Sequence, residues 1–186
     1  MRKIMIAAAL AGATTLAACD TTSPVIQYTP STANVLALQS AMKSSGNTVK
    51  VSDFATADGV ASPGCRMVGT LDVTGGKTLG QYLHDALQTE LFTAGVYDVN
   101  SPVAITGKLE SMKVNTFGTG SWTLVLSVAS SRDPTGYTVQ VTHSFSTSYM
   151  ATAACQNATN AFAPSVQELI GQVVANPGFA KLIGKS

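Results

Sequence analysis

The chain has 186 residues, of which 11 are Lys or Arg and 10 are Asp or Glu, so its formal net charge is +1. Only 11% of the residues are charged, and they form no basic stripe or acidic block, which argues against nucleic acid as a partner. The length suits one domain with its own hydrophobic core and a short extension.

The first eighteen residues have the layout of a secretory signal peptide. Arg2 and Lys3 give a positive start, and residues 4–13 are uncharged and mostly small or apolar. The segment is too short and too rich in Ala and Thr to predict a transmembrane helix. We therefore expect residues 1–18 to be a signal peptide that is removed on export.

The signal peptide ends in a motif that resembles the lipobox of bacterial lipoproteins, formed by Leu16, Ala17, Ala18 and Cys19. The resemblance implies cleavage before Cys19, a diacylglycerol on its thiol and a fatty acyl chain such as palmitate on its amine. Two or three acyl chains anchor a protein stably. We expect a lipid-anchored envelope protein that faces the periplasm. Asp20 resembles the inner-membrane retention signal of enterobacterial lipoproteins, but other bacteria use other rules, so the choice of inner or outer membrane stays open. The alternative is an ordinary signal peptide that contains a cysteine.

The segment 19–47 is interpreted as the lipidated cysteine and a tether, in which a short helix could form over residues 32–42. Its first part is rich in Thr, Ser and Pro and has no periodicity. A single domain is expected over residues 48–186. It begins with a strand at 48–55, where Val49 and Val51 alternate with polar residues.

The clearest helix is predicted over residues 78–94. Thr78 and Gln81 have the spacing of a capping box, which satisfies free backbone donors at a helix start. Gly95 stands where a left-handed C-terminal cap is expected. The apolar face of this helix comprises Leu79, Leu83, Ala86, Leu87, Leu91 and Ala94.

Three strands are predicted next, over residues 103–110, 122–130 and 137–149. In the third, apolar residues occupy one face and Thr, Ser and Gln the other, as expected for a strand with one face on a core and one in water. The turn-rich residues 132–136 make the last two strands a hairpin.

The chain ends in helical segments. Residues 151–161 are rich in Ala, Pro164 is expected to start a new helix or to kink an existing one, and residues 166–174 form an apolar stripe. A short segment follows at 179–183. The order of elements predicts an α+β fold in which helices cover one face of a mostly antiparallel sheet.

Cys65 and Cys155 are the thiols that remain once Cys19 is lipidated. Two cysteines in an oxidising compartment usually pair, so we expect a disulfide between them. The alternative is a pair of unpaired or redox-active thiols, but a Cys-x-x-Cys motif is absent.

The sequence offers no set of residues that predicts catalysis. His84 and His143 are the two histidines, and without fixed partners they make a poor metal site. Residues 75–78 and 118–120 are similar to phosphate-binding loops but lack their spacing, so we interpret both as turns. A Gly-x-Ser-x-Gly elbow is also absent. We expect no enzyme activity, no metal and no cofactor.

The layout as a whole resembles small envelope lipoproteins, namely the YajG-type lipoproteins and the auxiliary lipoproteins of ABC-type lipid transporters. The resemblance rests on the lipobox, the order of elements and a few apolar positions, and it carries over no functional residue. It implies a non-enzymatic role in the envelope. The Cys65 and Cys155 pair lies outside the shared pattern.

Two functions follow as hypotheses. The first is a non-catalytic accessory or binding module for a protein partner in the envelope. The second is a lipoprotein that binds a small molecule or glycan in a pocket between sheet and helices, lined by Trp122, Tyr137 and Tyr149.

Overall fold

The computed structural model describes residues 27–43 and 46–184. The predicted signal peptide, Cys19 and Asp20 lie outside the described residues. Ten elements follow in chain order: α1 Thr32–Lys43, β1 Lys50–Thr56, β2 Gly64–Cys65, β3 Gly69–Thr70, α2 Leu79–Thr93, β4 Ala104–Asn115, β5 Gly120–Ser130, β6 Tyr137–Phe145, α3 Ala151–Ala175 and α4 Phe179–Leu182.

The main sheet has four strands in the order β1-β4-β5-β6. The last three form an antiparallel meander, and β1 pairs with β4 in parallel. A parallel pair needs a crossover connection, which α2 provides between β1 and β4. The predicted α+β fold with a mostly antiparallel sheet is therefore confirmed.

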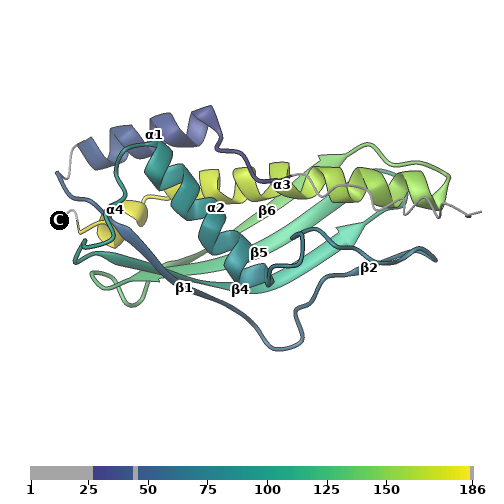
Figure 1. The fold of residues 1–186 in the computed structure, drawn as a ribbon, viewed down its shortest axis with the longest axis horizontal. Coiled ribbons are helices and arrows are strands. Elements are labelled where there is room, and N and C mark those ends of the chain that lie inside the picture. Colours follow the sequence, from purple (N-terminus) through teal and green to yellow (C-terminus); the bar gives the residue numbers. More distant parts are fainter. Residues whose placement is uncertain (1–26, 44–45, 185–186) are drawn as a thin grey trace, which may run out of the picture.

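One face of the sheet is covered by helices. Figure 1 shows α2 and α3 on the same side of the strands, with α1 packed against them farther from the sheet. Along β5, buried residues alternate with half-exposed ones, so that Trp122, Leu124 and Leu126 point to the helices. On the opposite face, β5 and β6 carry mostly Ser and Thr, which are half-exposed or exposed.

The core is centred on Trp122, which is fully buried. Its Nε1 donates a hydrogen bond of 2.8 Å to the Ala158 carbonyl, and its ring lies 5.2 Å from the ring of Phe162. Tyr82 on α2 packs against Phe162 from the other side at 5.3 Å. This stack joins the sheet to both covering helices.

The predicted helix at 78–94 is confirmed with its caps. Thr78 and Gln81 form the capping box, and the left-handed Gly95 closes the C-terminal end, where the Val96 N–H reaches the Leu91 carbonyl. The prediction for the last strand needs correction, and of the two alternatives for Pro164 the start of a new helix is excluded.

The helix α3 is continuous from Ala151 to Ala175, with Pro164 inside it. Pro164 does not start a new helix, although it removes one backbone hydrogen bond. The physical reason is burial: Phe162, Val166 and Leu169 around the proline are buried in the core, and that packing outweighs the lost bond.

The strand β6 ends at Phe145, four residues before the predicted end. Phe145 is paired with Gly120, the first residue of β5, so the strand has no partner beyond this point. Residues 146–150 form a loop, and Tyr149 is fully exposed instead of lying on the apolar face.

The segment that we assigned to the tether is partly folded. Leu38 and Met42 on α1 are buried in the common core, and α1 packs on α2 and α3. The packed part of the chain therefore extends to the N-terminal side of residue 48. Among the described residues, no helix combines the length and apolarity that crossing a bilayer requires.

Candidate functional site

The predicted disulfide is present. Cys65 and Cys155 are bonded, with their Cα atoms 5.8 Å apart, and both are buried. The bond ties β2 to the second turn of α3. It therefore fixes the β2–β3 turn against the end of the sheet where β6 gives way to α3.

The two histidines lie on opposite parts of the fold, His84 on α2 and His143 on the edge strand β6. Nδ1 of His84 is 3.0 Å from Asp85 Oδ1, and Nδ1 of His143 is 2.9 Å from Glu168 Oε2. Each histidine therefore has one surface carboxylate and no common partner. Within residues 27–43 and 46–184, no group of three His, Cys, Asp or Glu could hold a metal ion.

Asp85 also pairs with Lys77, whose Nζ lies 2.6 Å from Oδ2. Partial burial acts to raise the pKa of Asp85, but the hydrogen bonds and charges of Lys77 and His84 outweigh it and lower that pKa. The carboxylate is thus stabilised in its charged form at the surface of α2.

Glu90 has a buried carboxylate that was not predicted from the sequence. It holds the N-terminal segment through hydrogen bonds. Glu90 on α2 is fully buried, and its Oε1 accepts hydrogen bonds from Tyr28 Oη at 2.6 Å, the Ser31 N–H at 2.9 Å and Asn34 Nδ2 at 3.1 Å. Asn34 also donates to the Gln167 carbonyl on α3. Burial, followed by the hydrogen bond to Glu90, raises the pKa of Tyr28 far above its usual value.

The sequence does contain an indication that Glu90 is buried. It stands three and four residues after Leu87 and Ala86 and directly before Leu91, on the apolar face of the helix. A charged residue within an apolar stripe indicates a buried polar contact, because an unpaired buried charge is costly. Its partners could not be inferred, since they lie about sixty residues earlier in the chain.

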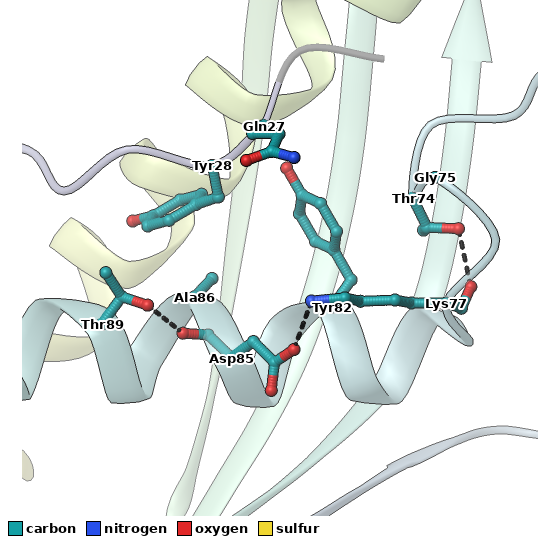
Figure 2. A pocket seen from close by; sticks show the side chains of 9 residues that line it. All are labelled: Gln27, Tyr28, Thr74, Gly75, Lys77, Tyr82, Asp85, Ala86 and Thr89. Atoms are coloured by element: carbon teal, nitrogen blue, oxygen red, sulfur yellow. Dashed lines mark hydrogen bonds and ion pairs between the residues drawn. The ribbon is translucent and has the colours of Figure 1, made fainter. Parts of the chain in front are cut away.

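A shallow groove of about 250 Å³ lies between this N-terminal segment and α2, as Figure 2 shows. Its polar groups bond one another: Lys77 reaches along α2 to Asp85, Thr74 Oγ1 donates to the Lys77 carbonyl, and Thr89 Oγ1 donates to the Asp85 carbonyl. The Tyr82 hydroxyl has no hydrogen-bond partner among the described residues but is fully buried. The groove therefore offers few free polar atoms to a ligand.

The glycine-rich residues 75–78 form a turn, as predicted. Gly75 and Gly76 both have positive φ, and Asp72 Oδ1 accepts hydrogen bonds from the N–H groups of Thr74 and Gly75. The carboxylate thus occupies the backbone donors of this loop.

Three turns meet at the end of the molecule that carries the disulfide, which lies at the right of Figure 1. We call this surface the loop end and define it as residues 66–68, 116–119 and 146–150. It carries five of the eight large hydrophobic residues that are exposed in the described part of the chain: Met67, Val68, Phe117, Tyr149 and Met150.

Arg66 connects the three turns. Its guanidinium donates to Thr116 Oγ1 at 3.3 Å, to the Thr116 carbonyl and to the Tyr149 carbonyl at 3.2 Å. It also lies 4.5 Å above the centre of the Phe117 ring, close enough for a cation–π interaction. Arg66 itself has a left-handed backbone, with φ of 47°. The side chain acts as a clamp across the loop end.

The turn 116–119 is held by its own contacts. Asn115 Nδ2 donates to the carbonyls of Phe117 and Thr119, and Asn115 Oδ1 accepts the Phe117 N–H. Thr147 Oγ1 from the neighbouring loop donates to the Thr116 carbonyl at 2.7 Å. Between these turns lies an open hollow of about 380 Å³, bordered by Arg66, Phe117, Gly118, Thr147, Ser148 and Tyr149.

The charge distribution of the loop end is one-sided. In the sequence stretches 59–71, 114–131 and 144–167, Arg66 is the single charged residue. Its guanidinium contacts neutral oxygens of Thr116, Thr147 and Tyr149 and the aromatic ring of Phe117. Its positive charge is therefore balanced by no carboxylate at this surface.

The pocket predicted for a small ligand is not formed. Trp122 is enclosed under α3, whereas Tyr149 is exposed at the loop end. Tyr137 donates its hydroxyl to the Val173 carbonyl at 2.6 Å. The reason is that Phe162 fills the space beside Trp122, and β6 ends before it reaches Tyr149.

Comparison with known proteins gives alignments to solved structures only at low identity. A scan against protein-family models finds no match. A search of curated proteins likewise finds none. A crystal structure of a Xanthomonas campestris protein from the family DUF330 aligns with a TM-score of 0.48 at 16% identity, covering 68% of this chain and 83% of that one. A crystal structure described as an uncharacterized protein aligns with a TM-score of 0.44 at 10% identity, covering 69% and 90%.

Proposed function

We propose that the protein is a lipid-anchored, non-catalytic lipoprotein of the bacterial envelope that acts as an accessory or binding module for a partner at the membrane. The anchor is supported by the signal peptide and by the lipobox ending at Cys19. The binding role is supported by the loop end, which is the observation that carries the proposal.

The loop end has the properties of a binding surface. Exposed apolar groups gathered in one place mark interaction sites, whereas single ones are ordinary. Here the disulfide and the Arg66 clamp hold these groups in fixed positions, so that little order has to be gained on binding. Away from the loop end, Glu90 holds the N-terminal segment, and each of the two histidines pairs with a carboxylate.

Photo-crosslinking in growing cells tests the proposal. A benzophenone amino acid replaces Phe117 at the loop end in one strain and Phe92 on α2 in another. The two positions are a matched pair, because their side chains are 68% and 73% exposed. We expect residue 117 to form adducts with an envelope component and residue 92 to form few. Equal and low yields at both positions would contradict the proposal.

A further inference from the structure

We infer that the partner of the loop end is the lipid bilayer itself, so that the anchored domain rests on the membrane with Met67, Phe117 and Tyr149 in its interfacial layer. This inference rests on the proposed lipid anchor and names what the loop end touches. It follows from the chemistry of that surface, from the position of the tether and from the contrast between the two ends of the molecule.

The apolar side chains of the loop end are gathered at one surface, but they project from separate turns. Met67 and Tyr149 expose essentially their whole surface, 99% and 106% of the reference value, so neither packs on a neighbour. A protein interface needs a complementary packed surface, with its anchors seated in pockets. A bilayer needs no such complementarity, because lipids adapt to the shape of what enters. Aromatic residues with polar tips are also typical of the membrane interface.

The charge of the loop end suits lipid headgroups. Arg66 is the single charged residue in the stretches that form this end, and its partners are neutral. A cation without a carboxylate attracts anionic lipid phosphates, and no negative side chain at this end opposes the approach. The surrounding residues are mainly Ser, Thr, Gly and Ala. Their transfer to the membrane interface costs little free energy.

The opposite end of the molecule lacks these properties. The strand β5 runs from Gly120 at the loop end to Ser130, beside which α4 docks through the bond of the Ser130 hydroxyl to the Leu182 carbonyl. The segments gathered there carry charges of both signs, namely Lys43, Lys50, Asp98, Arg132, Asp133 and Lys181. Placing that end on the bilayer would require ionic groups to lose water, which is unfavourable.

The tether is long enough for this orientation. Tyr28 is fixed to α2 through Glu90 and through its ring contact with Tyr82, and the eight residue-to-residue steps from Cys19 to Gln27 can span at most about 28 Å. Tyr82 packs on Phe162, and the helical rise from Phe162 back to Ala151 is roughly 17 Å. The loop end is therefore within the reach of a lipid attached to Cys19.

Tryptophan fluorescence in vesicles tests the inference with the full lipidated protein. The native Trp122 is the single Trp and is fully buried, so it gives a constant background. Phe117→Trp adds a reporter at the loop end, and Phe92→Trp adds a matched one on α2. Both proteins are reconstituted through their own lipid into vesicles of phosphatidylethanolamine and phosphatidylglycerol, with and without brominated acyl chains.

In these vesicles, the reporter of Phe117→Trp should emit at shorter wavelength and lose most of its emission to brominated lipid. The reporter of Phe92→Trp should instead be quenched by aqueous iodide. Tyr149→Trp should repeat the first result. If the loop-end reporters stay accessible to iodide while photo-crosslinking in cells gives a protein adduct, the bilayer inference is wrong and the proposed function stands. If the protein does not join the vesicles at all, the proposed lipid anchor itself fails.

Discussion

Gly80 on α2 lies directly against the backbone carbonyl of Phe54 on β1. A Cβ atom on residue 80 would overlap with the Phe54 oxygen, and a backbone atom cannot move aside as a side chain can. The first turn of α2 thus sits on the edge strand at a distance that only glycine permits.

Gly80→Ala is therefore expected to destabilise the domain. In an ordinary helix interior the same change is favourable by about 1 kcal/mol. Here overpacking should cost roughly 1–3 kcal/mol, measured as the free energy of unfolding in urea. Gly64→Ala is the control, because a Cβ at that position meets nothing within 4 Å. Equal stability of the two variants would show that α2 does not approach β1 this closely.

Loss of the disulfide should lower stability strongly. Cys65 and Cys155 are 90 residues apart in sequence, and closing a loop of that length is worth about 4–5 kcal/mol on the chain-entropy estimate. We expect reductant to lower the melting temperature of the native protein and to leave Cys155→Ser unchanged. Two free thiols in protein taken from the periplasm would contradict the pairing.

Glu90→Ala should release the N-terminal segment. The change leaves three donors, on Tyr28, Ser31 and Asn34, without their common acceptor, and each unpaired buried donor costs about 1–3 kcal/mol. Hydrogen exchange of the amides in residues 28–35 should accelerate. Glu110→Ala removes a surface carboxylate paired with Lys108 and should change little. Glu90→Gln, which keeps an acceptor oxygen, should fall between the two.

The buried tyrosines should limit stability at high pH. Burial raises the pKa of Tyr82 to about 12, and it raises the pKa values of Tyr28 and Tyr137 as well. Because the folded protein holds these protons more tightly than the unfolded chain, their contribution is complete below about pH 10 and is lost as the pH rises further.

Tyrosinate absorbance checks this expectation. In the folded protein, the three phenols should ionise only as the domain unfolds in alkali, whereas protein in guanidinium should titrate all of its tyrosines together near the ordinary pKa. Ionisation of all tyrosines near pH 10 with an intact circular dichroism spectrum would show that they are not buried as described.

Cys19→Ala should abolish lipidation. Without the thiol, neither the diacylglycerol nor cleavage before residue 19 can follow, so the variant should persist as a larger, unprocessed precursor. Growth with a radioactive fatty acid should label the wild-type protein and not the variant. The same label on both would show that this cysteine is not the attachment site.

The elements that could be predicted are those whose capping residues, turns and apolar alternation lie within their own stretch of sequence. The helix α2 carries its capping box and Gly95 in its own sequence, and the hairpin of β5 and β6 is encoded by alternation and by the turn between them. In β4 the alternation breaks at a register shift between Leu109 and Ser111, which is why the prediction ended at residue 110, five residues early. The parallel pairing of β1 with β4 has no local signature at all.

The loop end could not be predicted, because its parts are distant in sequence. Each turn contributes one or two apolar residues among polar ones, which by itself resembles an ordinary surface loop. The disulfide prediction joined two of the three segments, but nothing in the sequence shows that Arg66 reaches Thr116 and Tyr149. Packing of α1 was missed for a similar reason, since the residues that Leu38, Met42 and Asn34 contact lie on α2 and α3, far along the chain.

The disulfide also sets how the domain responds to mechanical force. A pull on the N-terminus loads the hydrogen bonds to Glu90 first and then the docking of α1. The segment that is pulled precedes the ring closed by Cys65 and Cys155, whereas Glu90 lies within that ring. The chain between these two cysteines, a sequence separation of 90, cannot be extended while the bond is intact. The extension of the unfolding protein is therefore shorter by roughly 300 Å of contour length. Force applied through the tether would therefore detach α1 from the domain while the disulfide ring stays closed.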